Sequence, residues 1–145
     1  MPATLASRIR VLATGRSIRL AVRASGTSVT EVYGVGPVHA ASLIGYSGDI
    51  ARLANRDAYA CYNGTAPVEF PSGGRTVHRL SMRGSRRLNN TLHMAAVTQI
   101  RNPGTEGRIY FERKVAEGKT KKEALRSLKR QISNAVYRQL LLDAR

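Results

Sequence analysis

Ser72 is the residue whose setting most favours covalent chemistry. It follows Pro71 and precedes two glycines, so its hydroxyl can be presented to a large substrate without steric hindrance. A serine hydroxyl is a weak nucleophile until a base or a metal ion activates it, and His78 is the only evident local base. Basic residues that could hold a phosphate follow closely, namely Arg75, Arg79, Arg83, Arg86 and Arg87. The competing interpretation is that Ser72 is an ordinary turn residue.

A second candidate is the turn Gly34-Val35-Gly36, which separates two expected helices. Gly34 and Gly36 would let the backbone approach a DNA phosphate, and the helix that begins at Pro37 would offer free N–H groups and the positive end of its dipole. Such contacts are independent of base sequence. The alternative is a tight turn that only packs the two helices together.

Two basic stretches could bind phosphates by side-chain contacts. Arg86 and Arg87 begin an expected helix over residues 85–102, and Lys121 and Lys122 belong to a second stretch at residues 119–130. Helical spacing separates a polar face from an apolar face in the first of these, with Arg86, Asn90 and His93 on one and Leu88, Leu92 and Ala95 on the other. The alternative is a solvated face, which is the usual role of charged helix surfaces.

The composition favours a nucleic-acid partner. Lysine and arginine total 24 against 9 acidic residues, which gives a net charge of +15 in 145 residues. The 42% hydrophobic content is enough for a packed core. A single cysteine, Cys61, excludes an internal disulfide framework and suits the cytoplasm. The sequence contains no membrane-spanning apolar run and no metal-ligand spacing, so we expect no membrane and no cofactor bound to this chain.

The sequence predicts a mostly α fold. Residues 1–26 are expected to form a residual helix or the remnant of an upstream linker, and residues 27–145 a single domain. Within this domain we expect a helix-hairpin-helix-like element at 28–46, a glycine-rich loop or small hairpin at 65–84 with a possible strand at 77–81, and a helical remainder at 85–145.

Capping residues mark the helix ends. Ser28 and Glu31 fit one capping box, and Thr120 and Glu123 fit another. Asn55 and Thr105 are further expected N-caps, and glycines at 64 and 118 are expected helix ends. The last helix carries one apolar stripe, made of Leu125, Leu128, Ile132, Val136 and Leu140, and its Arg126 and Arg130 lie off the stripe and are expected to face outward.

Several motifs in order give the sequence a family resemblance. They are Gly34-Val35-Gly36-Pro37, Gly48-Asp49-Ile50, Tyr62-Asn63-Gly64-Thr65-Ala66-Pro67-Val68-Glu69, Ser72-Gly73, His78-Arg79-Leu80-Ser81, Gly84-Ser85-Arg86-Arg87-Leu88-Asn89 and Gly107-Arg108-Ile109-Tyr110. From about residue 26 to the end, the chain resembles the C-terminal transposase domain of the IS-one-ten (insertion sequence) family of bridge-RNA-guided transposases. Ser85 stands where that family usually has Asn, and Leu53 where Phe is common.

The resemblance implies a DNA transposase or recombinase that works with a guide RNA. It implies that Ser72 attacks the DNA backbone and becomes joined to it, and that an N-terminal RuvC-like nuclease domain supplies acidic residues and Mg²⁺. No counterpart of that domain is expected in these 145 residues, so the chain is expected to be a truncated form or an isolated domain that is inactive alone. The full-length protein is expected to form a homo-oligomer.

Other function classes remain open from the residues alone. A non-enzymatic, basic DNA- or RNA-binding module would use the same glycine turn and basic helices. A ribosomal or nucleoid protein is a third possibility, but it would not need a serine–glycine loop between ordered helices.

Overall fold

The computed structural model describes the backbone of residues 15–67 and 74–145, and the side chains of residues 16–67 and 86–145. This part of the chain contains six α-helices and no strand, which confirms the mostly α fold class. The α-helices are α2 (Gly15–Ser25), α3 (Pro37–Ser47), α4 (Arg56–Asn63), α5 (Gly74–Arg101), α6 (Glu106–Ala116) and α7 (Lys121–Asp143), and two short 3-10 helices are η1 (Val29–Glu31) and η2 (Ile50–Arg52). Within these residues, no helix is long and apolar enough to cross a membrane.

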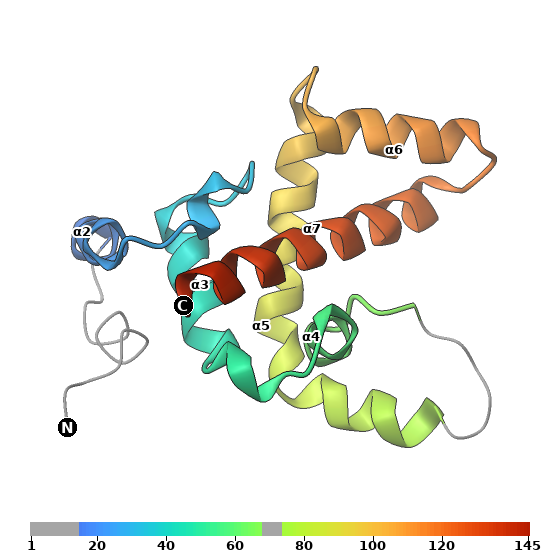
Figure 1. The fold of residues 1–145 in the computed structure, drawn as a ribbon. Coiled ribbons are helices and arrows are strands. Elements are labelled where there is room, and N and C mark those ends of the chain that lie inside the picture. The colour runs from blue at the N-terminus through green and yellow to red at the C-terminus, as the bar shows by residue number, and fades with distance from the viewer. Residues whose placement is uncertain (1–14, 68–73) are drawn as a thin grey trace.

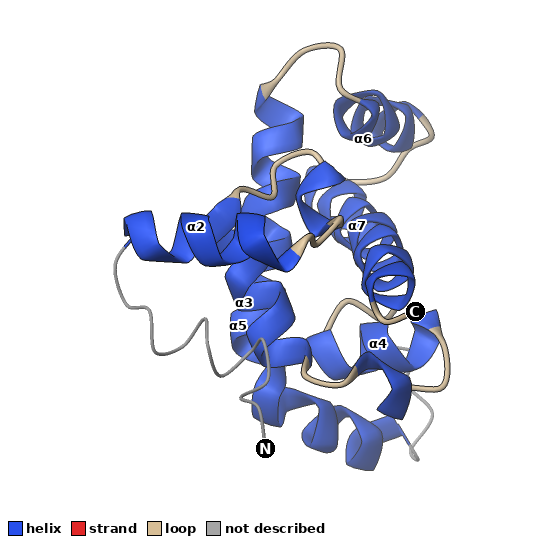
Figure 2. Ribbon diagram, turned by 60° about the vertical axis from the view of Figure 1, so that its left-hand side comes forward, coloured by secondary structure: helices blue, strands red, loops and turns tan. Residues whose placement is uncertain are grey.

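Helices α5 and α7 cross at the centre of the molecule, and the other helices pack around them. Figure 1 shows α6 on one side of the first half of α7 and α4 on the other, and Figure 2 shows α2 at the periphery beside α3. The core lies where α3, α5 and α7 meet, and its fully or almost fully buried side chains include Leu43, Leu88, Leu92, Leu128, Ile132 and Val136. The apolar face predicted for residues 88–95 is therefore confirmed.

Residues 74–84 are helical, so the expected loop or hairpin over this stretch and the expected strand at 77–81 are wrong. The physical reason is that no proline interrupts residues 74–101, so the backbone hydrogen bonds of the helix can continue through this stretch. Gly84 costs about 1 kcal/mol in a helix interior, which a helix of 28 residues can tolerate. Figure 1 shows α5 turning sharply in this light-green to yellow part, and a glycine–serine pair such as Gly84-Ser85 is a common cause of such a bend.

The structure also corrects the expected element at residues 28–46. Its first part is the single 3-10 turn η1 and not an α-helix, and Ser28 makes no side-chain cap to it. The expected capping box is wrong because the Glu31 amide donates to the Ser28 carbonyl at 3.0 Å, while the Ser28 hydroxyl donates to Asp143 at the end of α7, with an Oγ to Oδ1 distance of 2.7 Å. The Ser28 amide and the Thr27 hydroxyl also donate to the Asp143 carboxylate, so η1 is fixed to the last turn of the chain.

The other capping predictions are confirmed. Asn55 caps α4, Thr105 caps α6, and Thr120 with Glu123 forms a complete capping box at the start of α7. Gly64 ends α4 in the left-handed conformation, and Gly118, also at positive φ, follows the end of α6. In the predicted stripe of α7, four members are buried and Leu125 is half-buried.

Candidate nucleic-acid interface

A groove of about 700 Å³ lies between the turn that follows α4 and the first half of α7. Its backbone wall is the turn at residues 64–67, which Figure 1 shows in light green beside α7. Its other wall consists of Lys119, which precedes α7, and of α7 side chains, namely Glu123, Arg126, Ser127, Lys129 and Arg130. We call it the basic groove, because four of these side chains are cationic and one is acidic.

Buried polar side chains hold the turn in place. The fully buried Asn63 accepts hydrogen bonds at Oδ1 from the amide of Thr65 (3.1 Å) and from its hydroxyl (2.6 Å). It donates through Nδ2 to Ser133 Oγ of α7 at 2.8 Å. A buried polar group must be hydrogen-bonded to be tolerated, and here each bond ties the turn to a fixed partner. The groove wall therefore has a defined shape.

Asn89 extends this network to a groove cation. Its Nδ2 donates to the carbonyl of Asn63 at 3.2 Å, and its Oδ1 accepts from Lys129 Nζ at 2.7 Å. Burial lowers the pKa of the Lys129 ammonium, and the positive charge of Arg126 lowers it further. The surroundings of Lys129 thus disfavour its positive charge. An anion bound in the groove would stabilise that charge.

The groove has a net positive charge after local pairing. Arg130 makes an ion pair with the exposed Asp57 and is itself only partly exposed, whereas Arg126 is exposed, as the sequence predicts. Glu123 is engaged by the amide of Thr120 in the capping box. In the part of the chain that the structure describes, Lys119 and Arg126 make no ion pair. Lys129 has only the neutral amide of Asn89 as a partner, so three groove cations have no ion-pair partner among the described residues.

The acidic residues elsewhere are largely engaged in local bonds. Of the eight carboxylates within residues 15–67 and 74–145, six cap a backbone or pair with a cation, namely Asp49, Asp57, Glu112, Glu117, Glu123 and Asp143. Only three cations of the same residues form ion pairs: Arg108, Lys114 and Arg130. Most of the positive charge is consequently not neutralised within the fold.

A cluster of two tyrosines and two arginines joins α3, α4 and α5 at the surface. The Arg87 guanidinium lies 5.3 Å from the Tyr46 ring centre and donates to its Oη at 2.6 Å. Arg52 lies 4.6 Å from the Tyr62 ring centre, and the Tyr62 hydroxyl donates to the carbonyl of Tyr46 at 3.1 Å. Sequence reasoning identified Arg87 but missed its aromatic partner, because 41 residues separate the two.

The structure brings the predicted arginines into one helix. Arg75, Arg79, Arg83, Arg86 and Arg87 all belong to α5, and the spacing of four between the first three places these positions along one side of its backbone. Arg86 is exposed. Ser72 lies outside the described residues, as does the segment 68–73.

The two glycines of the predicted phosphate turn occupy different surroundings. Gly34 has a φ of +89°, and a Cβ there would lie 2.8 Å from the backbone oxygen of Ala95, so this glycine allows the turn to pack closely on α5. Gly36 precedes α3 as its N-cap and has open space around it. Their predicted role in DNA binding stays a prediction.

Lys121 and Lys122 are exposed at the start of α7 but do not line the basic groove. None of the four groove cations was among the named binding residues, although all four lie in the basic stretch at residues 119–130, and three of them are Arg126, Lys129 and Arg130 of α7. Their spacing of three and four was the available signal, because it places them on one side of a helix. In the described segments, no group of His, Cys, Asp and Glu side chains could hold a metal ion.

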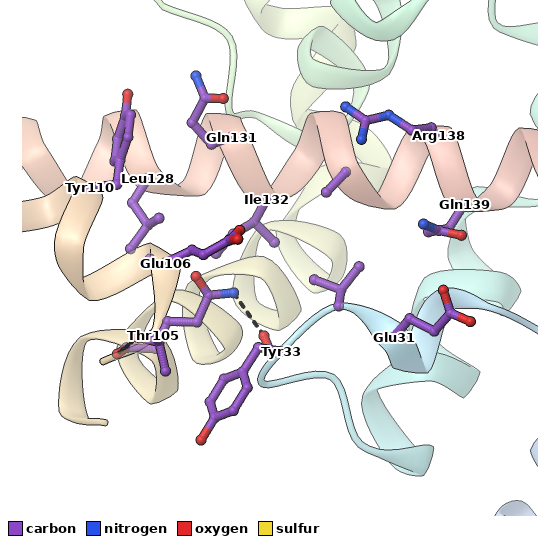
Figure 3. Close-up of a pocket in the computed structure, with 14 residues that line it drawn as sticks. Glu31, Tyr33, Thr105, Glu106, Tyr110, Leu128, Gln131, Ile132, Arg138 and Gln139 are labelled. Carbon is purple, nitrogen blue, oxygen red and sulfur yellow. Dashed lines mark hydrogen bonds between the residues drawn. The ribbon is translucent and has the colours of Figure 1, made fainter. Parts of the chain in front are cut away.

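Another side of α7 borders a second hollow, of about 620 Å³, which we call the polar pocket. Figure 3 shows its lining, which includes Glu31, Tyr33, Gln99, Glu106 and Arg138. Gln99 Nε2 donates to the carbonyl of Tyr33 at 2.8 Å, drawn as a dashed line in Figure 3. Gly107 allows this bond, because a Cβ at that position would collide with the Gln99 side chain.

Comparisons with known proteins agree with the sequence motifs. A family described as "Transposase IS116/IS110/IS902 family" matches residues 26–111. The chain is also similar to the "Insertion element IS116 uncharacterized 44.8 kDa protein" of Streptomyces clavuligerus, with 33% identity over 114 residues. That alignment covers 77% of this chain and 28% of the relative, so the chain spans less than a third of the length of this relative. No solved structure matches. Because the match includes more than half of its residues, the chain belongs to the IS116/IS110/IS902 transposase family.

Proposed function

We propose that this chain is a nucleic-acid-binding part of a DNA transposase and that the basic groove binds a sugar–phosphate backbone. The observation that carries the proposal is the groove itself, in which a turn fixed by Asn63 faces the cations of α7. Phosphate contacts by lysine and arginine supply most of the affinity of sequence-independent binding. We propose that the bound polymer is DNA, which membership in a transposase family supports, and that a guide RNA is a further partner.

We also propose that Ser72 is the nucleophile of the transposition reaction. Its segment joins Pro67, which lines the groove, to Gly74, where α5 begins. Since each residue spans at most about 3.6 Å, the five steps along the chain from Pro67 to Ser72 keep Ser72 within about 18 Å of the groove. The Ser72 Oγ would form a bond to a backbone phosphorus as one ester P–O bond breaks.

The serine hydroxyl needs a proton acceptor, and arginines cannot serve as one. Arginines can hold the phosphate and stabilise its additional charge, but they stay protonated and cannot accept the hydroxyl proton. We therefore propose that the proton acceptor lies in a separate nuclease domain, where bound Mg²⁺ would make the serine hydroxyl easier to deprotonate, and that the chain alone does not react.

Binding is tested by titrating a fluorescent DNA duplex with the chain at rising salt concentration. We expect affinity to fall steeply, because each neutralised phosphate releases counterions. A double variant of the groove, Lys119→Gln with Arg126→Gln, should weaken binding and flatten the salt dependence. An affinity that is independent of salt would contradict the proposal.

Covalent chemistry is tested separately, by incubating the chain with transposon-end DNA, guide RNA and Mg²⁺, with and without an added nuclease domain. We expect a protein–DNA adduct only with that domain and only with Ser72 present. An adduct that persists in Ser72→Ala would exclude this nucleophile. Intact binding with no adduct under either condition would favour the non-enzymatic binding module.

A further inference from the structure

A small apolar hollow of about 270 Å³ opens between α5, α6 and the first turns of α7. Its walls are the half-buried side chains of Val97, Ile100, Phe111 and Leu125. Three cations stand around it, Arg101 at the end of α5 and Lys121 with Lys122 at the start of α7, and all three are exposed. We call this hollow with its cations the apolar pit.

The walls of the apolar pit are continuous with the protein core. Ile100, Phe111 and Leu125 pack against the buried core cluster, so the pit has a fixed shape. Its volume equals that of about nine water molecules at about 30 Å³ each. This is room for one planar ring system and less than the hollow that a drug-sized ligand occupies.

Among the described residues, the charges around the pit, those of Arg101, Lys121 and Lys122, have no ion-pair partner. Glu112, the carboxylate next to Phe111 in the chain, is paired with Arg108 at 2.9 Å. A ligand that suits the pit therefore has an apolar, flat body and negative charges directly beside it.

We propose that the apolar pit receives one unpaired nucleobase of a bound nucleic acid, while Arg101, Lys121 and Lys122 contact the phosphates on either side of that base. A nucleotide combines a flat ring with flanking phosphates, which is the pattern of the pit and its cations. A second copy of this chain is a poorer occupant, because it carries a net charge of +15 and would bring like charges together.

The inference rests on the proposed nucleic-acid binding and adds that nucleic acid with an unpaired base is bound more tightly. The apolar pit and the basic groove border different sides of the first half of α7. The groove binds backbone regardless of pairing, whereas the pit accepts a base only where it is free of its partner. The structure thus predicts a preference for nucleic acid with an unpaired base.

The test compares two DNA duplexes that differ at one bulged position, which carries either 2-aminopurine or an abasic sugar. Binding is followed by fluorescence anisotropy, and the environment of the base by 2-aminopurine emission. We expect the full chain to bind the base-containing bulge about tenfold more tightly, because burial of one base on apolar side chains contributes on this scale. Emission should change on binding, because the base leaves its neighbours in the stack.

Three variants and one control locate the effect. Leu125→Gln should abolish the tenfold preference, and Lys121→Gln with Lys122→Gln should reduce it. Arg126→Gln in the basic groove should weaken binding to both duplexes equally and keep the preference. Leu142→Gln, an exposed position on the same helix, is the matched control and should change nothing. Circular dichroism of each variant identifies loss of folding.

Distinct results overturn the inference. Equal affinity of the unmodified chain for the two bulges would refute the pit as a base site while leaving the basic groove intact. A preference that survives in folded Leu125→Gln would place the base elsewhere. A change of oligomeric state in that variant, with the preference retained, would show that a second copy occupies the pit. Absence of any binding to either duplex would contradict the proposed function itself.

Discussion

The basic groove and the polar pocket are hollows of similar volume on different sides of α7, and they differ in charge. The groove has four cations and one carboxylate that is engaged in a helix cap. The pocket has Glu31 and Glu106 against Arg138, and its lining also includes side-chain amides and two tyrosines. Volume alone therefore does not distinguish a nucleic-acid site in this protein. The balance of charge that remains after local pairing does.

The two hollows have one structural feature in common. In each, a side-chain amide of a mostly buried residue holds a loop: Asn63 fixes the turn beside the groove, and Gln99 holds the carbonyl of Tyr33 beside the pocket. The difference in function must then come from the side chains that α7 presents to each hollow. Substitutions that alter one hollow, compared with matched changes elsewhere, therefore test this difference.

Replacing the apolar floor of the polar pocket should have the largest effect. Leu128 lines the pocket but is only 2% exposed, so Leu128→Ala would leave a cavity in the core. We expect a loss of about 2–5 kcal/mol in the free energy of unfolding, measured by urea denaturation. Leu142→Ala, at a position 45% exposed, should stay within about 0.5 kcal/mol of the unmodified chain. Equal effects of the two would show that the pocket floor is not part of the core.

Breaking the wall of the basic groove should have the next largest effect. Asn63→Ala removes the partners of the Thr65 hydroxyl and of Ser133, and both are buried. We expect a loss of about 1–3 kcal/mol in the free energy of unfolding, since buried polar groups without partners are costly. The control is Asn90→Ala at an exposed position of α5. An unchanged melting temperature for Asn63→Ala would mean that the network does not hold the turn.

Removing one arginine from each hollow tests the charge difference directly. Arg126→Gln in the groove should weaken DNA binding about fivefold, or about 1 kcal/mol, and lower the salt slope by about 0.9. Arg138→Gln in the polar pocket is the matched change on the same helix and should leave both quantities unaltered. Titrations at several salt concentrations measure both. If the Arg138 variant lost as much affinity, the assignment of the nucleic-acid site to the groove would be wrong.

The smallest effect at neutral pH belongs to Tyr59, a fully buried residue of α4. Burial raises the pKa of its hydroxyl to about 12 from 10.0, so the folded chain holds this proton more tightly than the unfolded chain does. The stabilisation is complete below pH 10 and is lost as the pH rises from about 10 to 12. Denaturation at several pH values should show this decline. Tyr59→Phe should show a smaller decline, whereas Tyr33→Phe, at an exposed position, should not alter it.

Local signals in the sequence predicted the helix boundaries that depend on local contacts. Asn55, Thr105 and the Thr120–Glu123 box cap helices as expected, because each bonds to a backbone within three residues. Ser28 and Glu31 have the same spacing but form no box, because the Glu31 amide bonds to the Ser28 carbonyl and the Ser28 hydroxyl is directed to Asp143, 115 residues away. The start of α5 was missed because glycines and prolines in the sequence suggested a turn.

The candidate site was only partly predictable for the same reason. The sequence singled out Arg86, Arg87, Lys121 and Lys122 by their clustering in the chain. The basic groove instead depends on Asn63, Asn89 and Lys129, which are 26 and 40 residues apart in successive steps. In the sequence, Asn89 cannot be distinguished from other polar residues of a helix. Its role depends on the fold, which places the Asn63 carbonyl and the Lys129 ammonium within hydrogen-bond distance of its side-chain amide.

The bond between Asp143 and the start of η1 has a consequence for the order of folding. Its hydrogen bonds join Asp143 to Ser28 and Thr27, which lie 115 and 116 positions earlier in the sequence. They therefore close a loop that contains most of the chain. Loop-closure entropy makes such a contact unfavourable until α3, α5 and α7 have already packed. This loop therefore closes late during folding and opens early during unfolding. The amide of Ser28, which donates to Asp143, is a site where hydrogen exchange would report this opening without global unfolding.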